Sequence, residues 1–277
     1  SDEIAGHLNE EWANKLGLTT KTVIAVGTFD AHSGAVGAKV DKHALVRVMG
    51  TSTCDIMVAD EAVIGVVLSG CGVNDGSEIH EAVITMLELD KANADMVLMA
   101  PNIDQLHVIN HATGEEMNDS RNVLVESARI ARGNIKDIVE ITSDDVDALI
   151  FPGGFGVAKN LSDYAMAGAE CSINPDVQRL SKDMHNDGKP IGVICIAPAM
   201  MAQILGEETE LTIGYDDQTA NDINTMGAKH ITCPVEDIVI DDDKKVVSTP
   251  AYMEANSIKE AAEGIQKLVE QVLKMVK

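Results

Sequence analysis

Aromatic residues, positive charges and long apolar runs are scarce in this sequence. Phe, Trp and Tyr make up 3% of the 277 residues, so the core must consist of aliphatic side chains and methionine. The 21 Lys and Arg face 45 Asp and Glu, and the formal net charge of −24 argues against nucleic acid and anionic membranes as partners. Neither a signal peptide nor an apolar run of membrane-spanning length is visible. We therefore expect a cytoplasmic protein.

Disulfide, metal-binding and nucleotide-binding patterns are also missing. The five cysteines are odd in number and include no Cys-x-x-Cys pair, which argues against a disulfide framework and fits a reducing compartment. His107 and His111 flank a polar loop without a companion cysteine, so we expect no metal site. The glycine-rich turn at residues 152–156 lacks both GxGxxG and the P-loop Lys-Ser/Thr. No cofactor is expected.

The most informative segment is an apolar run that ends at Cys195. Residues 191–194 precede it, and Pro198 then opens a helix-compatible stretch that reaches Leu205. This pattern predicts a strand, a sharp turn and a helix, the arrangement of a nucleophile elbow. Because a helix N-terminus favours the thiolate, we predict that Cys195 is a nucleophile with a pKa below the reference of about 8.5. An inert buried cysteine is the alternative.

A second segment, residues 147–156, predicts a buried strand followed by a glycine-rich turn. Glycines directly after a strand let the backbone turn tightly and direct its N–H groups into a shared cleft. We expect the backbone at Gly153, Gly154 and Ile196 to hold the oxyanion that forms when Cys195 adds to a carbonyl.

A third segment places carboxylates near the first strand of this region, residues 63–69. Asp75 and Glu78 have capping-box spacing, so Glu78 is predicted to begin a helix, with a secondary role in the site as the alternative. Glu81 follows one turn later among apolar neighbours, where burial would raise its pKa and let it exchange a proton with a thiol. A solvated helix face is the other interpretation of Glu81.

Cys71 follows the same strand and is a candidate second thiol. Parallel strands deliver their carboxyl ends to one edge of a sheet, so Cys71 could approach Cys195. A packing role is an equally good interpretation.

Short apolar segments alternate with amphipathic ones after residue 62, which predicts a largely parallel sheet covered on both faces. The predicted strands are residues 63–69, 94–100, 147–151, 191–194 and 211–213, with a hairpin at 238–240 and 246–248. The predicted helices are residues 77–92, 120–131, 175–186, 199–205, 217–226 and 257–276.

Residues 62–277 resemble the PfpI superfamily, and within it the ElbB family. The segments that carry the resemblance are residues 68–72, 75–82, 108–115, 151–156, 159–162, 195–200 and 249–253. The resemblance implies a flavodoxin-like three-layer α/β sandwich, with Cys195 as nucleophile and Glu81 beside it. It also implies a cofactor-independent glyoxalase activity on a small dicarbonyl, glyoxal to glycolate, which can also reflect protein deglycation.

One departure from the superfamily pattern concerns histidine. Many members place a histidine after the strand that follows the cysteine, but here residues 211–213 run into Gly214 and Tyr215. Only His230 follows Cys195, and it is predicted to pack at a helix–strand junction. A glutamine amidotransferase triad is therefore not expected, and Glu81 must handle the protons.

Residues 1–61 resemble a fragment of L-ribulokinase, a carbohydrate kinase of the FGGY family. The resemblance lies in residues 25–38 and 49–55, and it implies a catalytic base at Asp30 and phosphate contacts at Gly50 and Thr51. The sugar-binding domain is missing, so we expect no kinase activity. A short helix at residues 10–18 and β-rich runs at 22–28 and 45–49 are expected, with strand edges that pair two chains into a homodimer.

These observations leave three functional hypotheses. The preferred one is a cysteine-dependent glyoxalase on residues 62–277, preceded by a chemically inert kinase fragment. The second is a non-enzymatic domain that senses redox state or binds a partner, with Cys195 oxidised rather than turned over. The third is an engineered fusion without a new function.

Overall fold

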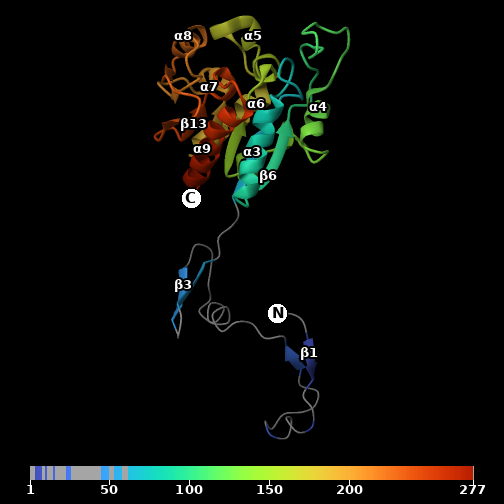
Figure 1. Ribbon diagram of the computed structural model, residues 1–277, viewed down its shortest axis with the longest axis vertical. Coiled ribbons are helices and arrows are strands. Elements are labelled where there is room, and N and C mark those ends of the chain that lie inside the picture. The colour runs from blue at the N-terminus through green and yellow to red at the C-terminus, as the bar shows by residue number, and fades with distance from the viewer. Residues whose placement is uncertain are drawn as a thin grey trace. The chain divides into compact units, whose positions relative to one another are not determined.

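The chain divides into two compact units, residues 1–60 and 61–277. The structure is a computed structural model that describes residues 4–7, 10, 15, 23–25, 45–49, 53–57 and 62–276 (Figure 1). In the described part, no helix is both long and apolar enough to cross a membrane.

The first unit contains two pairs of short antiparallel strands. β1 (Ile4–His7) pairs with β2 (Val23–Ala25), and β3 (Leu45–Met49) pairs with β4 (Thr53–Met57). Both predicted β-rich runs thus contain a strand, although β1 and β4 were not predicted. Within the predicted helix at residues 10–18, the described residues Glu10 and Lys15 are helical. Asp30, Gly50 and Thr51 lie outside the described residues.

The second unit is built on a seven-stranded sheet with the order β12-β13-β9-β8-β5-β6-β7. All neighbouring strands are parallel except β12, which pairs antiparallel with β13 as the predicted hairpin. The strands are β5 (Val63–Val67), β6 (Asp95–Ala100), β7 (Lys136–Asp137), β8 (Ala148–Phe151), β9 (Ile191–Ile194), β12 (Val239–Asp241) and β13 (Val246–Thr249).

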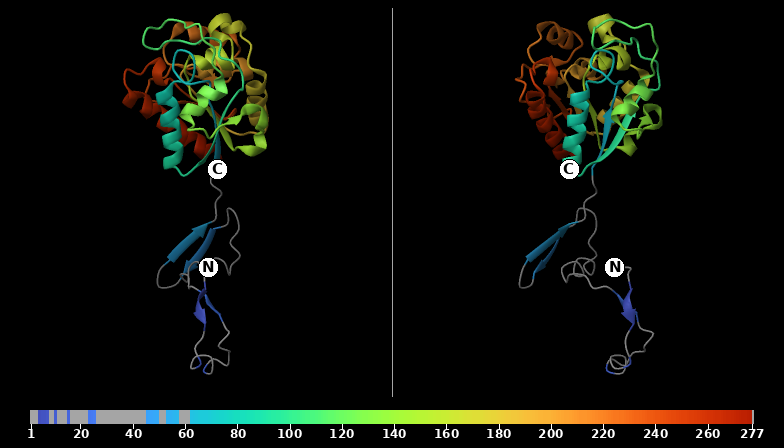
Figure 2. Two further views of the ribbon diagram at one scale, coloured as in Figure 1. Left: turned by 90° about the vertical axis from the view of Figure 1, so that its right-hand side faces the viewer. Right: turned by 45° about the vertical axis from the view of Figure 1, so that its right-hand side comes forward.

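Helices cover both faces of this sheet (Figure 2). One face carries α3 (Ile79–Lys91), α4 (Val123–Ile130) and α9 (Ile258–Val276), and the other carries α6 (Pro175–Asn186) and α7 (Ala197–Leu205). The remaining α-helices are α5 (Tyr164–Ala167) and α8 (Asp217–Thr225). Short helical turns are η1 (Ile138–Glu140), η2 (Ser143–Asp145), η3 (Val157–Leu161), η4 (Gly168–Glu170) and η5 (Ala251–Met253).

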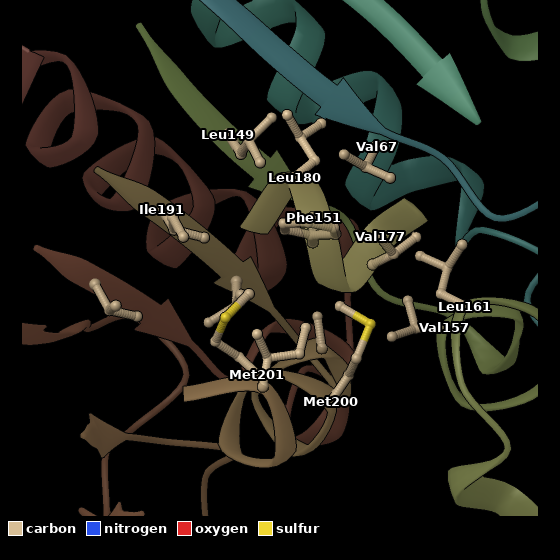
Figure 3. Packing of buried hydrophobic residues seen from close by; sticks show 14 of the residues in the cluster. Val67, Leu149, Phe151, Val157, Leu161, Val177, Leu180, Ile191, Met200 and Met201 are labelled. Atoms are coloured by element: carbon tan, nitrogen blue, oxygen red, sulfur yellow. The ribbon is translucent and has the colours of Figure 1, made fainter. Parts of the chain in front are cut away.

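Alternate strand residues fill two separate cores. Val67, Leu149 and Phe151 point toward α6 and α7, where they pack with Leu180 and Met200 (Figure 3). Their strand neighbours Val66 and Ile150 belong to the other core, together with residues of α3 and α9. This alternation follows from the two-residue period of a strand. The predicted flavodoxin-like three-layer fold is confirmed.

The strand predicted at residues 211–213 is wrong as a strand of the main sheet. The structure has β10 (Glu210–Leu211), which pairs with β11 (Lys229–His230) in a separate two-stranded sheet. Side chains of the hairpin strands, rather than their backbones, accept hydrogen bonds from this part of the chain. Asp241 Oδ2 accepts from Glu210 N at 2.9 Å, and Ser248 Oγ accepts from Thr212 N at 2.9 Å. The segment therefore lies beside the hairpin without adding a strand to the main sheet.

Candidate active site

The candidate site lies at the carboxyl edge of four neighbouring strands, β13, β9, β8 and β5. Glu81 follows β5 on helix α3, the glycine turn follows β8, Cys195 follows β9 and Tyr252 follows β13. Parallel strands end at one edge, so segments far apart in the sequence meet there.

Cys195 occupies a sharp turn between β9 and α7. Its φ of +61° lies in the left-handed region, which is strained for a residue with a side chain. The backbone N–H of Cys195 donates to Thr249 O at 3.0 Å, which ties the turn to β13. The residue is 8% exposed, and the backbone N–H groups of Gly154 and Ile196 lie near enough to its thiol to lower the thiol pKa. The local shape is that of a nucleophile elbow.

Glu81 is fully buried beside Cys195, since both side chains pack against Gly153 and the thiol lowers the pKa of the carboxyl. The backbone N–H of Gly153 donates to Oε2 at 2.8 Å, and the N–H of Tyr252 donates to Oε1 at 3.2 Å. Both carboxyl oxygens are therefore held in place by main-chain groups from two different loops. The alternative of a solvated helix face does not describe Glu81.

Glu78 is the N-cap of α3, and its side chain accepts from Glu81 N at 2.7 Å. The predicted capping box between Asp75 and Glu78 is wrong, because the helix begins three residues later than that pairing requires. Asp75 instead accepts from Ile109 N at 2.7 Å and so fixes the loop that contains Ile109.

The glycine turn packs too closely against these groups to carry side chains. A Cβ at Gly153 would lie 2.7 Å from Glu81 Oε2 and 3.0 Å from Cys195 Sγ. At Gly154, with φ of +98°, a Cβ would collide with the backbone of residues 76–78. The turn thus brings main-chain N–H groups directly against both Cys195 and Glu81.

Burial dominates the electrostatics of this pair. It raises the pKa of the Glu81 carboxyl to about 8, against the opposing effect of the N–H donors from Tyr252 and Gly153. Burial and then the Glu81 charge raise the pKa of the Cys195 thiol well above its ordinary value. The prediction of a pKa below the reference is wrong, because desolvation and a neighbouring carboxylate outweigh the N–H groups of Gly154 and Ile196.

These pKa shifts predict that Cys195 alkylates slowly at neutral pH. Both members of the pair hold a proton there, so the iodoacetamide rate at Cys195 should rise as the pH increases above 8. The alkylation rate is measured from pH 6 to pH 10 by mass spectrometry of the Cys195 peptide. A plateau that is already reached at pH 7 would contradict the raised pKa.

A cavity of about 630 Å³ opens onto Cys195. Its apolar wall includes Phe155, Ile196 and Met253, and its polar wall is formed by residues of α5 and α8. The sequence did not reveal this polar wall, which comprises Tyr164, Asp216, Gln218, Thr219 and Asp222. Nor did it reveal the N–H donor at Tyr252, since the spatial neighbours of a strand cannot be inferred from the chain order.

Two other sequence candidates lie away from this cavity. Cys71 is not among its lining residues, and burial followed by the Glu126 charge raises the pKa of its thiol. His230 Nε2 accepts from Ile213 N at 3.3 Å, so it stabilises the β10 segment. Among the described residues that line the cavity, none is a histidine.

Comparisons with known proteins are consistent with this geometry. Residues 71–253 match the DJ-1/PfpI family. The human glutamine amidotransferase-like class 1 domain-containing protein 3, mitochondrial, is 43% identical over 222 residues, which cover 76% of this chain and 82% of that protein. The rat ES1 protein homolog, mitochondrial, is 42% identical over 222 residues, which cover 76% and 83%. The expected cytoplasmic location is contradicted by these relatives, which are named mitochondrial.

A solved structure shows the same fold. The isoprenoid biosynthesis protein with amidotransferase-like domain from Ehrlichia chaffeensis is 39% identical, with a TM-score of 0.74 over 78% of this chain and 100% of that one. A further similarity is to ribulokinase from Vibrio parahaemolyticus, 46% identical over 83 residues, which cover 29% of this chain but 15% of the kinase. The similarity thus extends over only a fragment of a kinase.

Proposed function

The chain belongs to the DJ-1/PfpI family, and from this premise we propose that residues 62–277 form a cofactor-independent glyoxalase of the ElbB branch that converts glyoxal to glycolate. The observation that carries the proposal is that the Cys195 thiol and the Glu81 carboxyl are buried together against Gly153, with the N–H groups of Gly154 and Ile196 near the thiol. A nucleophile, an acid–base group and an oxyanion site are the three components that this chemistry needs.

The first step joins the thiol to the substrate. The sulfur of Cys195 adds to one carbonyl carbon of glyoxal, and the thiol proton passes to Glu81. The N–H groups of Gly154 and Ile196, which lie near the thiol, can stabilise the charge that develops on the carbonyl oxygen. Glu81 then passes this proton to that oxygen, which gives a hemithioacetal and returns Glu81 to its carboxylate form.

The second step moves a proton between the two carbons. Glu81 removes the hydrogen from the carbon bonded to sulfur and returns a proton to the neighbouring carbon, while the hydroxyl proton of the hemithioacetal passes to the former aldehyde oxygen. The aldehyde thereby becomes an alcohol and the hemithioacetal becomes a thioester. Water then cleaves the thioester to release glycolate and restore the thiol. The sum is glyoxal plus water to glycolic acid, with no external oxidant or reductant.

The name of the human relative, glutamine amidotransferase-like, suggests glutamine hydrolysis as an alternative reaction. That chemistry uses a histidine to protonate the leaving ammonia. No histidine lies among the described residues that line the cavity. Glu81 can serve a proton transfer within one small substrate, and so the dicarbonyl reaction is the better proposal.

The proposal predicts glycolate formation by the full chain from glyoxal in the presence of EDTA. Since the pKa of Glu81 is raised to about 8, the rate should rise as the pH increases from 6 to 9, when the pair loses its first proton. Glycolate is quantified by NMR, and the glyoxal adduct is located on the Cys195 peptide by mass spectrometry. An adduct without turnover would favour a sensing or binding role, and no adduct at all would contradict the proposal.

A further inference from the structure

We propose that the cavity at Cys195 selects carbonyl compounds that carry an ammonium group, held by Asp216 and Asp222, over compounds that carry a carboxylate. This inference rests on the proposed attack of Cys195 on a carbonyl and adds the class of substrate. It starts from the charges in the cavity wall. Three carboxylates line it, those of Glu78, Asp216 and Asp222, and the described lining residues include no Lys, Arg or His.

Asp216 and Asp222 are fixed by neutral partners. Asp216 caps α8, where Oδ1 accepts from Thr219 N at 2.8 Å. Asp222 Oδ2 accepts from the Tyr164 hydroxyl at 2.8 Å. Hydrogen bonds from Thr219 lower the pKa of Asp216, which is therefore ionised at neutral pH. Neutral donors orient both carboxylates without cancelling their charge.

The same unit pairs carboxylates with lysine elsewhere. Glu210 lies 2.6 Å from Lys229 and Glu207 lies 2.9 Å from Lys244. Within the described residues, no Lys or Arg nitrogen lies within 4.0 Å of Asp216 or Asp222. Their charge is thus available to a ligand in the cavity.

Lys159 lies near Phe155, a residue of the cavity wall, but is not itself among the residues that line the cavity. Its Nζ donates to Asn74 O at 2.9 Å and lies 5.4 Å from the centre of the Phe155 ring. Phe155 lines the main cavity, whereas Lys159 lines a smaller one of about 230 Å³ together with Asn74. Lys159 is therefore bound to a main-chain oxygen and forms no ion pair with the carboxylates of the cavity wall.

The negative charges of Asp216 and Asp222 also act on the Tyr164 hydroxyl. Burial raises the pKa of Tyr164, and the hydrogen bond to Asp222 and the charges of Asp222 and Asp216 raise it further. A carboxylate entering this space would meet the same repulsion, whereas an ammonium group would be attracted. The apolar residues Ile196 and Met253 lie in the same cavity and suit the carbon chain between the two ends of such a substrate.

Alkylation of Cys195 by three small reagents tests this selectivity without requiring turnover. The reagents are 2-bromoethylammonium, iodoacetamide and iodoacetate, and each rate at the Cys195 peptide is divided by the rate with 2-mercaptoethanol. We expect the normalised cationic rate to exceed the anionic rate by roughly fivefold or more at low ionic strength, and the ratio to shrink with salt.

The variant Asp216→Asn/Asp222→Asn should lower this ratio towards one, because it leaves Glu78 as the only carboxylate among the described residues that line the cavity. Asn keeps the helix cap at residue 216 and the acceptor for Tyr164 at residue 222, and the rate with uncharged iodoacetamide, measured on the same variant, corrects for any change in the reactivity of the thiol. The control Asp242→Asn/Asp243→Asn alters the net charge equally in an exposed turn and should keep the ratio. An unselective full-length protein, or selectivity that is undiminished in Asp216→Asn/Asp222→Asn, would overturn the inference.

This test separates the inference from the proposed function. Charge-selective alkylation without glycolate formation would reject the glyoxalase and keep the substrate class. Glycolate formation with unselective alkylation would keep the glyoxalase and reject the substrate class.

Discussion

Glycolate formation should fall by on the order of 10³-fold or more in the variant Cys195→Ser, because a serine hydroxyl is a far weaker nucleophile without a strong base beside it. Serine keeps the size of the side chain at a position with φ of +61°, so the elbow should persist. Initial rates of glycolate formation at pH 8.5 measure the effect.

The matched control for this variant is Cys233→Ser. Cys233 is also buried, and burial raises the pKa of its thiol to about 11, but it does not line the cavity. Its replacement should leave turnover unchanged. Equal losses in both variants would mean that serine disturbs the fold, and retained activity in Cys195→Ser would remove Cys195 from the reaction.

Glu81→Gln should lower turnover by roughly 10²–10⁴-fold, the usual contribution of one general acid–base group. The amide fills the same space but cannot accept the thiol proton or carry a proton between the two carbons. Glu88→Gln, on the same helix, is the control, since Glu88 pairs with Lys91 at 2.8 Å and does not line the cavity. If Glu81→Gln retains full activity, the proton must move through Glu78 or water.

The same variant should change how stability depends on pH. The pKa of Glu81 is about 8 in the folded chain against 4.5 for the ordinary group, so between these values the folded state holds a proton that the unfolded state has lost. The free energy of unfolding of the wild type must then fall as the pH rises, by at most about 1.4 kcal/mol per pH unit. The amide of Gln does not titrate, so the variant Glu81→Gln lacks this contribution to the pH dependence.

We therefore expect the wild type to lose stability relative to Glu81→Gln between pH 5 and 8. Urea denaturation followed by circular dichroism measures the difference at each pH. The slope of this difference is the diagnostic quantity, because the amide also faces one N–H donor that it cannot accept from, which shifts the difference equally at every pH. A difference that does not change with pH would contradict the raised pKa of Glu81.

The periodicity of apolar residues and the helix-start signals in the sequence were sufficient to predict much of the fold. The helix predicted at residues 175–186 coincides with α6, because an Asn N-cap and Pro175 mark its start. Residues 191–194 and 238–248 likewise formed the predicted strand and hairpin. Of the strand predicted at residues 211–213, only Leu211 belongs to a strand, β10, which lies outside the main sheet, and the N–H of Thr212 donates to the side chain of Ser248. Such long-range partners leave no local signature.

The candidate site was predicted in its composition but not in its electrostatics. Sequence pattern placed Cys195 at a helix N-terminus, which favours a low pKa, and the apolar neighbours of Glu81 indicated its burial. The closeness of the two groups depends on β5 and β9 lying on either side of β8, which chain order does not specify. Their mutual effect on pKa, and the acidic wall from α8, could only follow from the three-dimensional arrangement.

Most of the polar groups aimed at Cys195 and Glu81 are main-chain N–H groups, contributed by Gly153, Gly154, Ile196 and Tyr252. At residues 196 and 252 any amino acid except proline supplies the same donor. The side chains at these two positions can therefore change, and with them the shape of the cavity, while Cys195 and Glu81 keep their positions. A protein built this way can acquire new substrates through mutations in the wall of its cavity, with the nucleophile and its proton partner left as they are.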